Sequence, residues 1–369
     1  MTVPQLEIQA VAVVTAVACA LSGVFLVLRR MAMMSDAISH SILVGIVLAY
    51  FVTRDLTSPL LVVAAAATGL ATVALVELLQ RSGRVREDAA IGLVFPALFS
   101  AGVLLISRYA GDVHLDTDAV LLGELAFAPF DRFVVAGWDV GPRALWLMLG
   151  VLLLGGLFVA AFYKELKLAT FDPGLATALG FSPALVHYGL MGVVSVTTVG
   201  AFDAVGLILV VALMVGPAAA AYLLTDRLAV MIGLSAVLGA GAALAGYWTA
   251  HLLDVSIAGA MATLVGVEFG LVLLLARDRG LLAQARRRAR QKLEFAQAML
   301  AIHLYQHEGL PEAEVENRVD HLSDHLRWEP AFAARIVRLA EAHGYAGERD
   351  GRLELTEAGR ELARRMLVR

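Results

Sequence analysis

Long apolar stretches separated by short polar segments follow one another along the chain up to about residue 276. A bilayer core about 30 Å thick requires roughly 20 apolar residues in each helix that crosses it. On that criterion we predict membrane spans at 8–28, 31–52, 58–79, 89–107, 143–163, 183–202, 204–224, 228–250 and 255–276. Because the stretches 31–52 and 183–224 are compatible with broken helices, the pattern predicts eight to ten spans. The expected fold class is an all-α polytopic membrane protein.

The pattern changes after Arg279, where charged and amphipathic segments replace the apolar runs. Helical periodicity covers 289–308, 312–326 and 331–343. The segment GERDGRLEL then places Asp350-Gly351 between two short strands, which is a signal for a tight hairpin. Thr356 is placed to cap a last helix that reaches Val368. Three helices, a hairpin and a helix predict a small α+β winged-helix domain over 285–369, after a membrane domain over 1–284.

The composition agrees with a membrane protein. Of the 369 residues, 59% are hydrophobic and 17% are charged, and the mean hydropathy of +0.77 is too high for an ordinary soluble domain. Lysine and arginine are concentrated after the first, third, fifth, seventh and last stretches. This bias predicts that the N-terminus lies outside a cell membrane and that the C-terminal tail is cytoplasmic. The single cysteine, Cys19, excludes an intrachain disulfide and a cysteine-rich zinc cluster.

The second stretch contains Asp36 and His40, which are four residues apart. On a helix this spacing puts both side chains on one face, with Cβ atoms about 5–6 Å apart. An Asp at the centre of a spanning helix costs roughly 2.5–3.5 kcal/mol, so such residues are functional candidates. A carboxylate and an imidazole can together bind a divalent metal ion. The alternative is that Ser35 or Asp36 caps the helix and that His40 faces a polar neighbour.

A second carboxylate, Asp203, lies between apolar runs at 197–216. One interpretation is that Asp203 lines the same pathway as Asp36. The other is that it caps a helix at the outer interface. The sequence around Asp203 leaves both interpretations open.

The connection from Lys164 to Gly180, KELKLATFDPGLATALG, is amphipathic and is interrupted by Asp172, Pro173 and Gly174. A short helix that lies flat on the cytoplasmic face would dock a partner protein. A plain connecting loop is the alternative.

The tail contains two histidine pairs at helical i, i+4 spacing, His303/His307 and His321/His325. Such pairs can bind a regulatory metal, although exposed histidines on a solvated helix face are a simpler alternative. From Arg286 to Arg369 the chain has 15 basic and 14 acidic residues. Because phosphate binding depends on clustered positive charge, we do not expect this domain to bind DNA.

Several separated motifs resemble the permease subunits of bacterial metal-type ABC importers, the manganese, zinc and iron group. They are VLRRMAMMSDAISHSILVG (27–45), EDAAIGLVFPALFSAGVLLIS (87–107), KLATFDPGLATALG (167–180), AFDAVGLILVVALMVGPAAAAYLL (201–224) and LDVSIAGAMATLVG (253–266). The resemblance implies that Asp36 and His40, which match the family's DxxxH motif, are metal ligands of the transport pathway, and Asp203 is the third candidate. The phrase around Asp203, together with LDVSIAG, is more similar to the manganese or iron branch than to the zinc branch.

The same resemblance implies the partners. They are a second permease copy in a homodimer, two ATP-binding subunits, an extracytoplasmic metal-binding protein and the lipid of a bacterial cell membrane. It also implies that the connection after the fifth span contains the coupling helix, with candidate residues Lys164, Glu165, Lys167, Phe171, Asp172, Pro173, Gly174 and Gly180. The tail resembles the winged-helix, iron-dependent repressors of the diphtheria toxin repressor type, on LRWEPAFAARIVRLAEAHGY and GRLELTEAGRELARR.

The expected function is therefore that of a permease subunit in an ATP-driven importer of divalent metal, with manganese or iron favoured over zinc. The chain has no GxxxxGK[ST] motif, so we assign ATP hydrolysis to a separate subunit, and the chain itself is not expected to be an enzyme. No resident cofactor is expected, because the metal is the transported substrate. Two alternatives are a membrane-tethered, metal-responsive regulator and an ion-driven secondary metal carrier.

Overall fold

The computed structural model describes residues 2–55, 58–109, 125–135, 138–319, 321–322, 326–349 and 351–367. The chain divides into two units, Met1–Gly280 and Leu281–Arg369. The predicted boundary at 284/285 falls four residues beyond this division, inside the first helix of the second unit.

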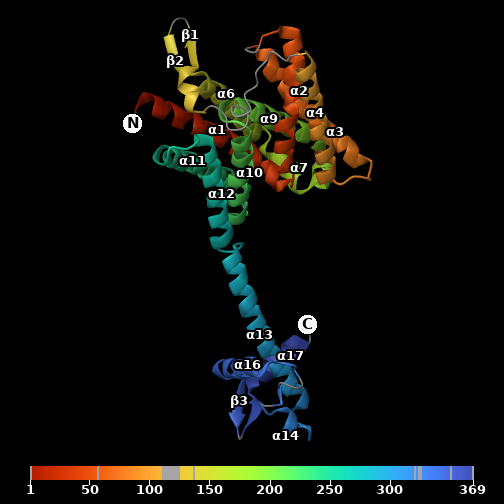
Figure 1. Cartoon of the computed structure of the whole chain (residues 1–369). Coiled ribbons are helices and arrows are strands. Elements are labelled where there is room, and N and C mark those ends of the chain that lie inside the picture. The colour runs from red at the N-terminus through yellow and green to blue at the C-terminus, as the bar shows by residue number, and fades with distance from the viewer. Residues whose placement is uncertain are drawn as a thin grey trace. The chain divides into compact units, whose positions relative to one another are not determined.

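Within the described part of the chain, nine helices are long and apolar enough to cross a membrane (Figure 1). Each predicted stretch corresponds to one of them, which confirms a polytopic, mostly helical protein with about nine spans. The helices are α1 (Val3–Leu28), α2 (Met33–Thr53), α3 (Pro59–Arg81), α4 (Glu87–Tyr109), α6 (Arg143–Ala161), α9 (Pro183–Val205), α10 (Leu207–Leu224), α11 (Leu228–Leu253) and α12 (Ile257–Leu275).

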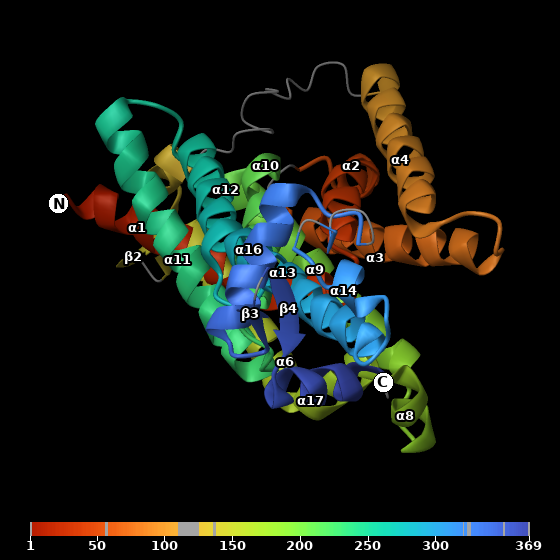
Figure 2. The same ribbon diagram turned by 90° about the horizontal axis from the view of Figure 1, so that it is seen from below.

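Helix α1 is the centre of the first unit. It packs against α6, α9, α10 and α11, while α2, α3 and α4 pack against one another and join the rest through α9 and α10. Both views show α11 beside α12, which also packs on α10 (Figure 2). Val24, Phe25 and Leu26 of α1 have no exposed surface. Small residues allow these close approaches, since in lipid no hydrophobic force drives one helix onto another.

The two ends of α1 mark opposite ends of the helical bundle. Near its start, Glu7 contacts Arg132 in a small antiparallel hairpin, β1 (Arg132–Val135) and β2 (Trp138–Pro142), which follows the 3₁₀ helix η1 (Leu125–Phe130). Just after its end, Arg29 contacts Thr170 in α7 (Tyr163–Phe171), which precedes α8 (Pro173–Ala178). Glu7 and Arg29 are about 33 Å apart along the helix at 1.5 Å per residue. We call these the hairpin end and the α7–α8 end.

One residue separates α9 from α10. Gly206 has φ of +78°, a conformation that residues with a Cβ rarely adopt, and its N–H bonds to the Phe202 carbonyl at 3.0 Å. The apolar stretch 183–224 is therefore two helices, as the predicted pair of spans requires.

The second unit contains α13 (Leu281–His307), α14 (Ala313–Glu316), α16 (Pro330–Ala342), the antiparallel pair β3 (Ala346–Arg349) and β4 (Arg352–Leu355), and α17 (Glu357–Leu367). Its core is formed by Leu300, Leu304, Ile336 and Leu353. Thr356 caps α17 as predicted, because its Oγ1 accepts a hydrogen bond from the Gly359 N–H at 3.2 Å. Asp350, the predicted first residue of the turn, lies outside the described residues.

Two predicted helices in this unit have the wrong bounds. The helix expected at 289–308 begins eight residues earlier, at Leu281. Within the helix expected at 312–326, α14 ends at Glu316 and the residues 317–319 are not helical, while 320 and 323–325 lie outside the described residues. The reason is tertiary: the Asn317 carbonyl accepts a hydrogen bond from the Leu353 N–H at 2.9 Å, and Arg318 forms a bridge with Arg352. Pairing with β4 therefore takes backbone groups that a longer helix would have used.

We expect Gly23→Ala to destabilise the first unit. A Cβ at Gly23 would overlap the backbone carbonyl of Met214 in α10, and backbone atoms cannot move aside cheaply. Overpacking of this kind costs about 1–3 kcal/mol. The measurement is the thermal unfolding temperature of the purified protein in detergent. Gly150→Ala is the matched control, because nothing lies within 4 Å of a Cβ there. Equal unfolding temperatures for the two variants would contradict the packing argument.

Candidate functional site

Asp36 and His40 lie on one face of the first turns of α2. The Nε2 atom of His40 is 3.6 Å from Oδ1 of Asp36, and both side chains are 30% exposed. Asp36 does not cap the helix, because the N-cap residue is Ala32, which has no side-chain capping bond. Ser35 does not cap it either, since its hydroxyl donates to the Ala32 carbonyl at 2.9 Å. The capping alternative is therefore wrong, and both side chains are available for a ligand.

Two aromatic rings from α4 hold the imidazole of His40. Phe95 stacks on it with a centroid distance of 5.4 Å, and Phe99 meets it edge-on at 5.9 Å. We did not single out either phenylalanine from the sequence. The available signal was their i, i+4 spacing, which puts both rings on one face of α4. The rings restrict the imidazole while leaving its Nε2 toward Asp36.

Asp36 also faces a groove of about 350 Å³ between α2, α10 and α12. The other residues that line it are apolar or glycine: Ala32, Met33, Val211, Ala212, Val215, Gly216, Ala262, Val265, Gly266 and Phe269. A carboxylate in such surroundings is stable only if a partner or an ion offsets the water it has lost. The groove thus brings one acidic ligand to an otherwise apolar surface.

Asp203 does not join this pair. It lies in the last turn of α9, about 24 Å along the helix from His187, and it is exposed. Its electrostatic neighbours are Arg143 and Asp131, which the Arg143 N–H to Asp131 carbonyl bond places beside the hairpin. Asp203 therefore belongs to the hairpin end. The interpretation of Asp203 as an N-cap is wrong, because the N-cap of α10 is Gly206.

The pair has two ligating side chains and no third. Among the described residues, no three His, Cys, Asp or Glu side chains come close enough together to hold a metal ion. Asp36 and His40 could supply only part of the coordination of a divalent cation. Water or another protein chain must supply the rest.

The predicted coupling residues lie at the α7–α8 end. The side chains of Lys164, Lys167, Phe171, Asp172 and Pro173 are exposed, as are Gly174 and Gly180, and Glu165 is half-buried. The stretch forms two short helices that meet at Asp172, where the sequence indicated an interruption, and the Asp172 Oδ1 caps α8 by accepting the Leu175 N–H at 2.9 Å. Three large apolar side chains are exposed on this surface, Phe171 at 59%, Leu175 at 46% and Leu179 at 57%.

Behind this surface lies a polar network that sequence analysis missed. Arg29 donates from Nε to Thr170 Oγ1 and from Nη1 to His187 Nδ1, both at 3.1 Å. His187 Nε2 lies 2.6 Å from Glu77 Oε1, and the Tyr188 hydroxyl donates to Glu77 Oε2 at 2.6 Å. Burial lowers the pKa of Arg29. The sequence signal was the presence of Glu77 and His187 at the ends of apolar stretches, but it did not indicate that they meet.

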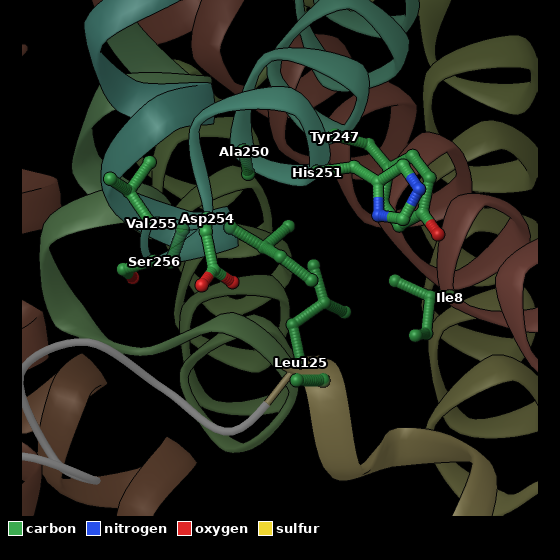
Figure 3. Close-up of a pocket in the computed structure, with 11 residues that line it drawn as sticks. Ile8, Leu125, Tyr247, Ala250, His251, Asp254, Val255 and Ser256 are labelled. Atoms are coloured by element: carbon green, nitrogen blue, oxygen red, sulfur yellow. The ribbon is translucent and has the colours of Figure 1, made fainter.

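At the hairpin end, Arg132 bridges two carboxylates, Glu7 at 2.7 Å and Asp139 at 2.8 Å. The hydrogen bond from Arg132 lowers the pKa of Asp139. A cavity of about 300 Å³ nearby is lined by residues of α1, η1, α11 and α12 and of the turn between α11 and α12; His251 of α11 and Asp254 of the turn are among them (Figure 3). The His251 ring stacks on Tyr247 at 6.3 Å, whereas the Asp254 carboxylate lies apart from both rings. These two groups do not converge on one point.

In the second unit, the rings of His303 and His307 lie 4.6 Å apart, and His303 Nε2 is 3.2 Å from the Glu316 carbonyl. His321 Nδ1 is 3.9 Å from Glu316 Oε2, and His325 lies outside the described residues. The predicted regulatory metal site in the tail stays a prediction.

Comparisons with known proteins agree with the geometry of the first unit. The model of the ABC 3 transport family matches residues 6–277. The zinc transport system membrane protein TroD of Treponema pallidum is 50% identical over 362 residues, 98% of each chain. The manganese transport system membrane protein MntD of Bacillus subtilis is 48% identical over 287 residues, 78% of this chain and 97% of that one.

Among solved structures, PsaBC from Streptococcus pneumoniae in complex with Fab has a chain that superposes with a TM-score of 0.62. That chain is 26% identical, and the match covers 76% of this chain and 94% of that one. None of these comparisons supports the alternatives of a membrane-tethered regulator or an ion-driven carrier.

Proposed function

The chain belongs to the ABC 3 transport family, and we propose that it is the membrane permease subunit of an ATP-driven importer of divalent metal ions. The observation that carries this proposal is the Asp36–His40 pair, a partly exposed carboxylate and imidazole 3.6 Å apart inside a spanning helix. Groups that are costly to bury in a bilayer are retained where they serve an ion pathway. Metal entering from outside would exchange part of its water shell for these two ligands.

The ligand chemistry suits first-row divalent metals. A carboxylate favours harder ions such as Mn²⁺, an imidazole favours ions such as Zn²⁺ and Fe²⁺, and a mixed pair accepts all three. TroD is named for zinc and MntD for manganese, and these two relatives are almost equally similar to this chain. We therefore limit the substrate to a divalent transition metal. The preference for manganese or iron that the sequence indicated stays a hypothesis.

We infer that a second copy of the chain completes the site. Two side chains leave a metal ion short of ligands, and Asp36 opens onto an apolar groove between α2, α10 and α12. A second copy that covers this groove about a two-fold axis would bury its apolar surface and bring its own Asp36 and His40 near the first pair. The ion would then have two carboxylates and two imidazoles. Asp203, at the hairpin end, would act at the entrance rather than at this central site.

We assign the α7–α8 end to the cytoplasm, because Arg29, Arg30, Arg81, Lys164 and Lys167 lie there. A separate ATP-binding subunit would dock on the exposed face of α7 and α8, where Phe171, Leu175 and Leu179 present apolar surface. The hairpin end would face an extracytoplasmic metal-binding protein. ATP-driven closure of the partners would then move α7 and open the metal site inward, in an alternating-access cycle.

Asp36→Ala and His40→Ala should each reduce ATP-dependent uptake of Mn²⁺ and Zn²⁺ by at least about tenfold, because each removes one of two ligands that the chain contributes. The measurement is uptake by vesicles that hold the chain with its ATP-binding subunit and binding protein. His343→Ala is the control, since it removes an exposed histidine of the second unit, which contributes nothing to the proposed metal site. Normal uptake by both site variants, with intact assembly, would refute the proposed site.

Phe171→Asp should prevent the ATP-binding subunit from co-purifying with the permease, because it places a charge within the exposed apolar face of α7 and α8. Phe127→Asp is a matched control, since Phe127 is 62% exposed and Phe171 is 59% exposed, but Phe127 lies in η1 at the hairpin end. Equal loss of the ATP-binding subunit in both variants would show that α7 and α8 are not the docking surface.

For the second unit we propose a cytoplasmic winged-helix-like module with a regulatory role. Its support is the order of α13, α14, α16, the β3–β4 pair and α17, together with its small apolar core. The match to TroD covers 98% of this chain and therefore extends through most of this unit. Its balanced charge favours a protein or metal signal over DNA.

Deletion of residues 286–369 should leave uptake by the assembled transporter within about twofold of wild type, because the proposed metal site and docking face lie in the first unit. The regulation of uptake by metal supply should be lost in this truncated protein. Uptake is measured in vesicles loaded with equal amounts of assembled complex. An assembled but inactive truncation would show that the second unit takes part in transport itself.

A further inference from the structure

Arg29 occupies the junction between the proposed metal site and the proposed docking face. It follows the last residue of α1, and only Arg29–Ala32 separate α1 from α2. Backbone bonds pin this turn: the Met31 N–H donates to the Leu26 carbonyl at 2.8 Å, and the Met34 N–H donates to the Met31 carbonyl at 3.0 Å. These bonds restrain the turn, so that a displacement of the Arg29 backbone would be transmitted to the start of α2.

The partners of Arg29 are of two kinds. Thr170, in the last turn of α7, is part of the surface element that would move with the ATP-binding subunit. His187, near the start of α9, is held in turn by Glu77 of α3. Because Arg29 donates to Nδ1, the neutral imidazole carries its proton on Nε2, which faces the Glu77 carboxylate 2.6 Å away. Arg29 thus connects α7 with α9 and, through His187, with α3.

The guanidinium has donor capacity that this arrangement does not use. Its Nη2 is buried and has no hydrogen-bond partner among the described residues. A buried donor without a partner costs roughly 1–3 kcal/mol. Such a group gains when an acceptor moves into reach. Arginine suits this role, because its planar fork offers five donors in fixed directions.

We propose that Arg29 is a positioning residue that transmits the movement of α7 to the metal-binding turn of α2. The inference rests on the proposed function. When the ATP-binding subunits close, α7 moves, Thr170 carries the guanidinium with it, and the stiff turn after α1 re-orients Asp36. The His187–Glu77 pair stays in place while the guanidinium of Arg29 moves relative to it. Arg29 would contribute to coupling without touching the metal.

The test measures ATP hydrolysis and Mn²⁺ or Zn²⁺ uptake in the same vesicles, which hold the full chain, its ATP-binding subunit and the binding protein. We expect Arg29→Gln to reduce the metal transported per ATP hydrolysed by at least about tenfold while ATP hydrolysis stays within about twofold. Retention of Mn²⁺ by the detergent-solubilised complex should be unchanged, since Asp36 and His40 are intact. Arg30→Asn is the matched control: Arg30 is adjacent and exposed, and asparagine accepts its positive φ of 62°.

A second variant tests the contact with α7 directly. Thr170→Val removes only the hydroxyl that accepts from Arg29, and it should reduce the same ratio by about three- to tenfold. In the Arg29→Gln background it should cause no further loss, because residues that act through one contact are not additive. Full additivity of the two variants would overturn the proposal.

The remaining outcomes are also decisive. A normal ratio of metal to ATP in Arg29→Gln would overturn the proposal. If Arg29→Gln fails to assemble, Thr170→Val decides, and a normal ratio in that variant would show that Arg29 is only a structural anchor. Parallel loss of hydrolysis and uptake in Thr170→Val would lead to the same conclusion. Failure of the proposed function is seen separately, as absence of ATP-dependent uptake by the wild-type complex.

Discussion

A charged side chain is stable inside a lipid-embedded helical bundle only where an opposite charge, a hydrogen bond or an ion replaces the water it has lost. This constraint explains where Glu7 and Glu77 lie, since each contacts a cationic or imidazole partner from another element. Asp36 is different, because its partner His40 is 3.6 Å away and the rest of its surroundings is an apolar groove. Such a weakly compensated carboxylate is well prepared to accept a cation.

The compensated charges also organise the bundle. Helix α1, buried along most of its length, is held by Arg132 at one end and by Thr170 and His187 at the other. Contacts with polar networks at both ends restrain α1 between the hairpin end and the α7–α8 end. In the proposed importer those surfaces would meet different partners, one that delivers metal and one that hydrolyses ATP. The architecture therefore suits the proposed cycle, in which movement of the ATP-binding subunit acts on the α7–α8 end and the proposed metal ligands lie one short turn away.

The second unit is a separate addition to this transport machinery. It has its own apolar core and its own hairpin, and the division of the chain leaves all nine candidate spans in the first unit. TroD, matched over 98% of its length by 98% of this chain, is long enough to have a comparable tail, whereas MntD is matched over 97% of its length by 78% of this chain. The length of MntD therefore leaves no room for a tail comparable to the second unit.

The sequence by itself determined the nine spans and the Asp36–His40 pair. Backbone groups in lipid must be satisfied within a helix, so an apolar stretch of sufficient length specifies a spanning helix, and i, i+4 spacing specifies a shared face.

The tertiary structure decided which other elements these helices and side chains contact. Phe95 and Phe99 enclose His40 from another helix, and Arg29 reaches Thr170 and His187 across 141 and 158 residues of chain. It also interrupted the predicted helix 312–326 after Glu316, because β4 competes for backbone groups at Asn317 and Arg318. Local periodicity carries no information about such long-range partners, which arise only when helices pack.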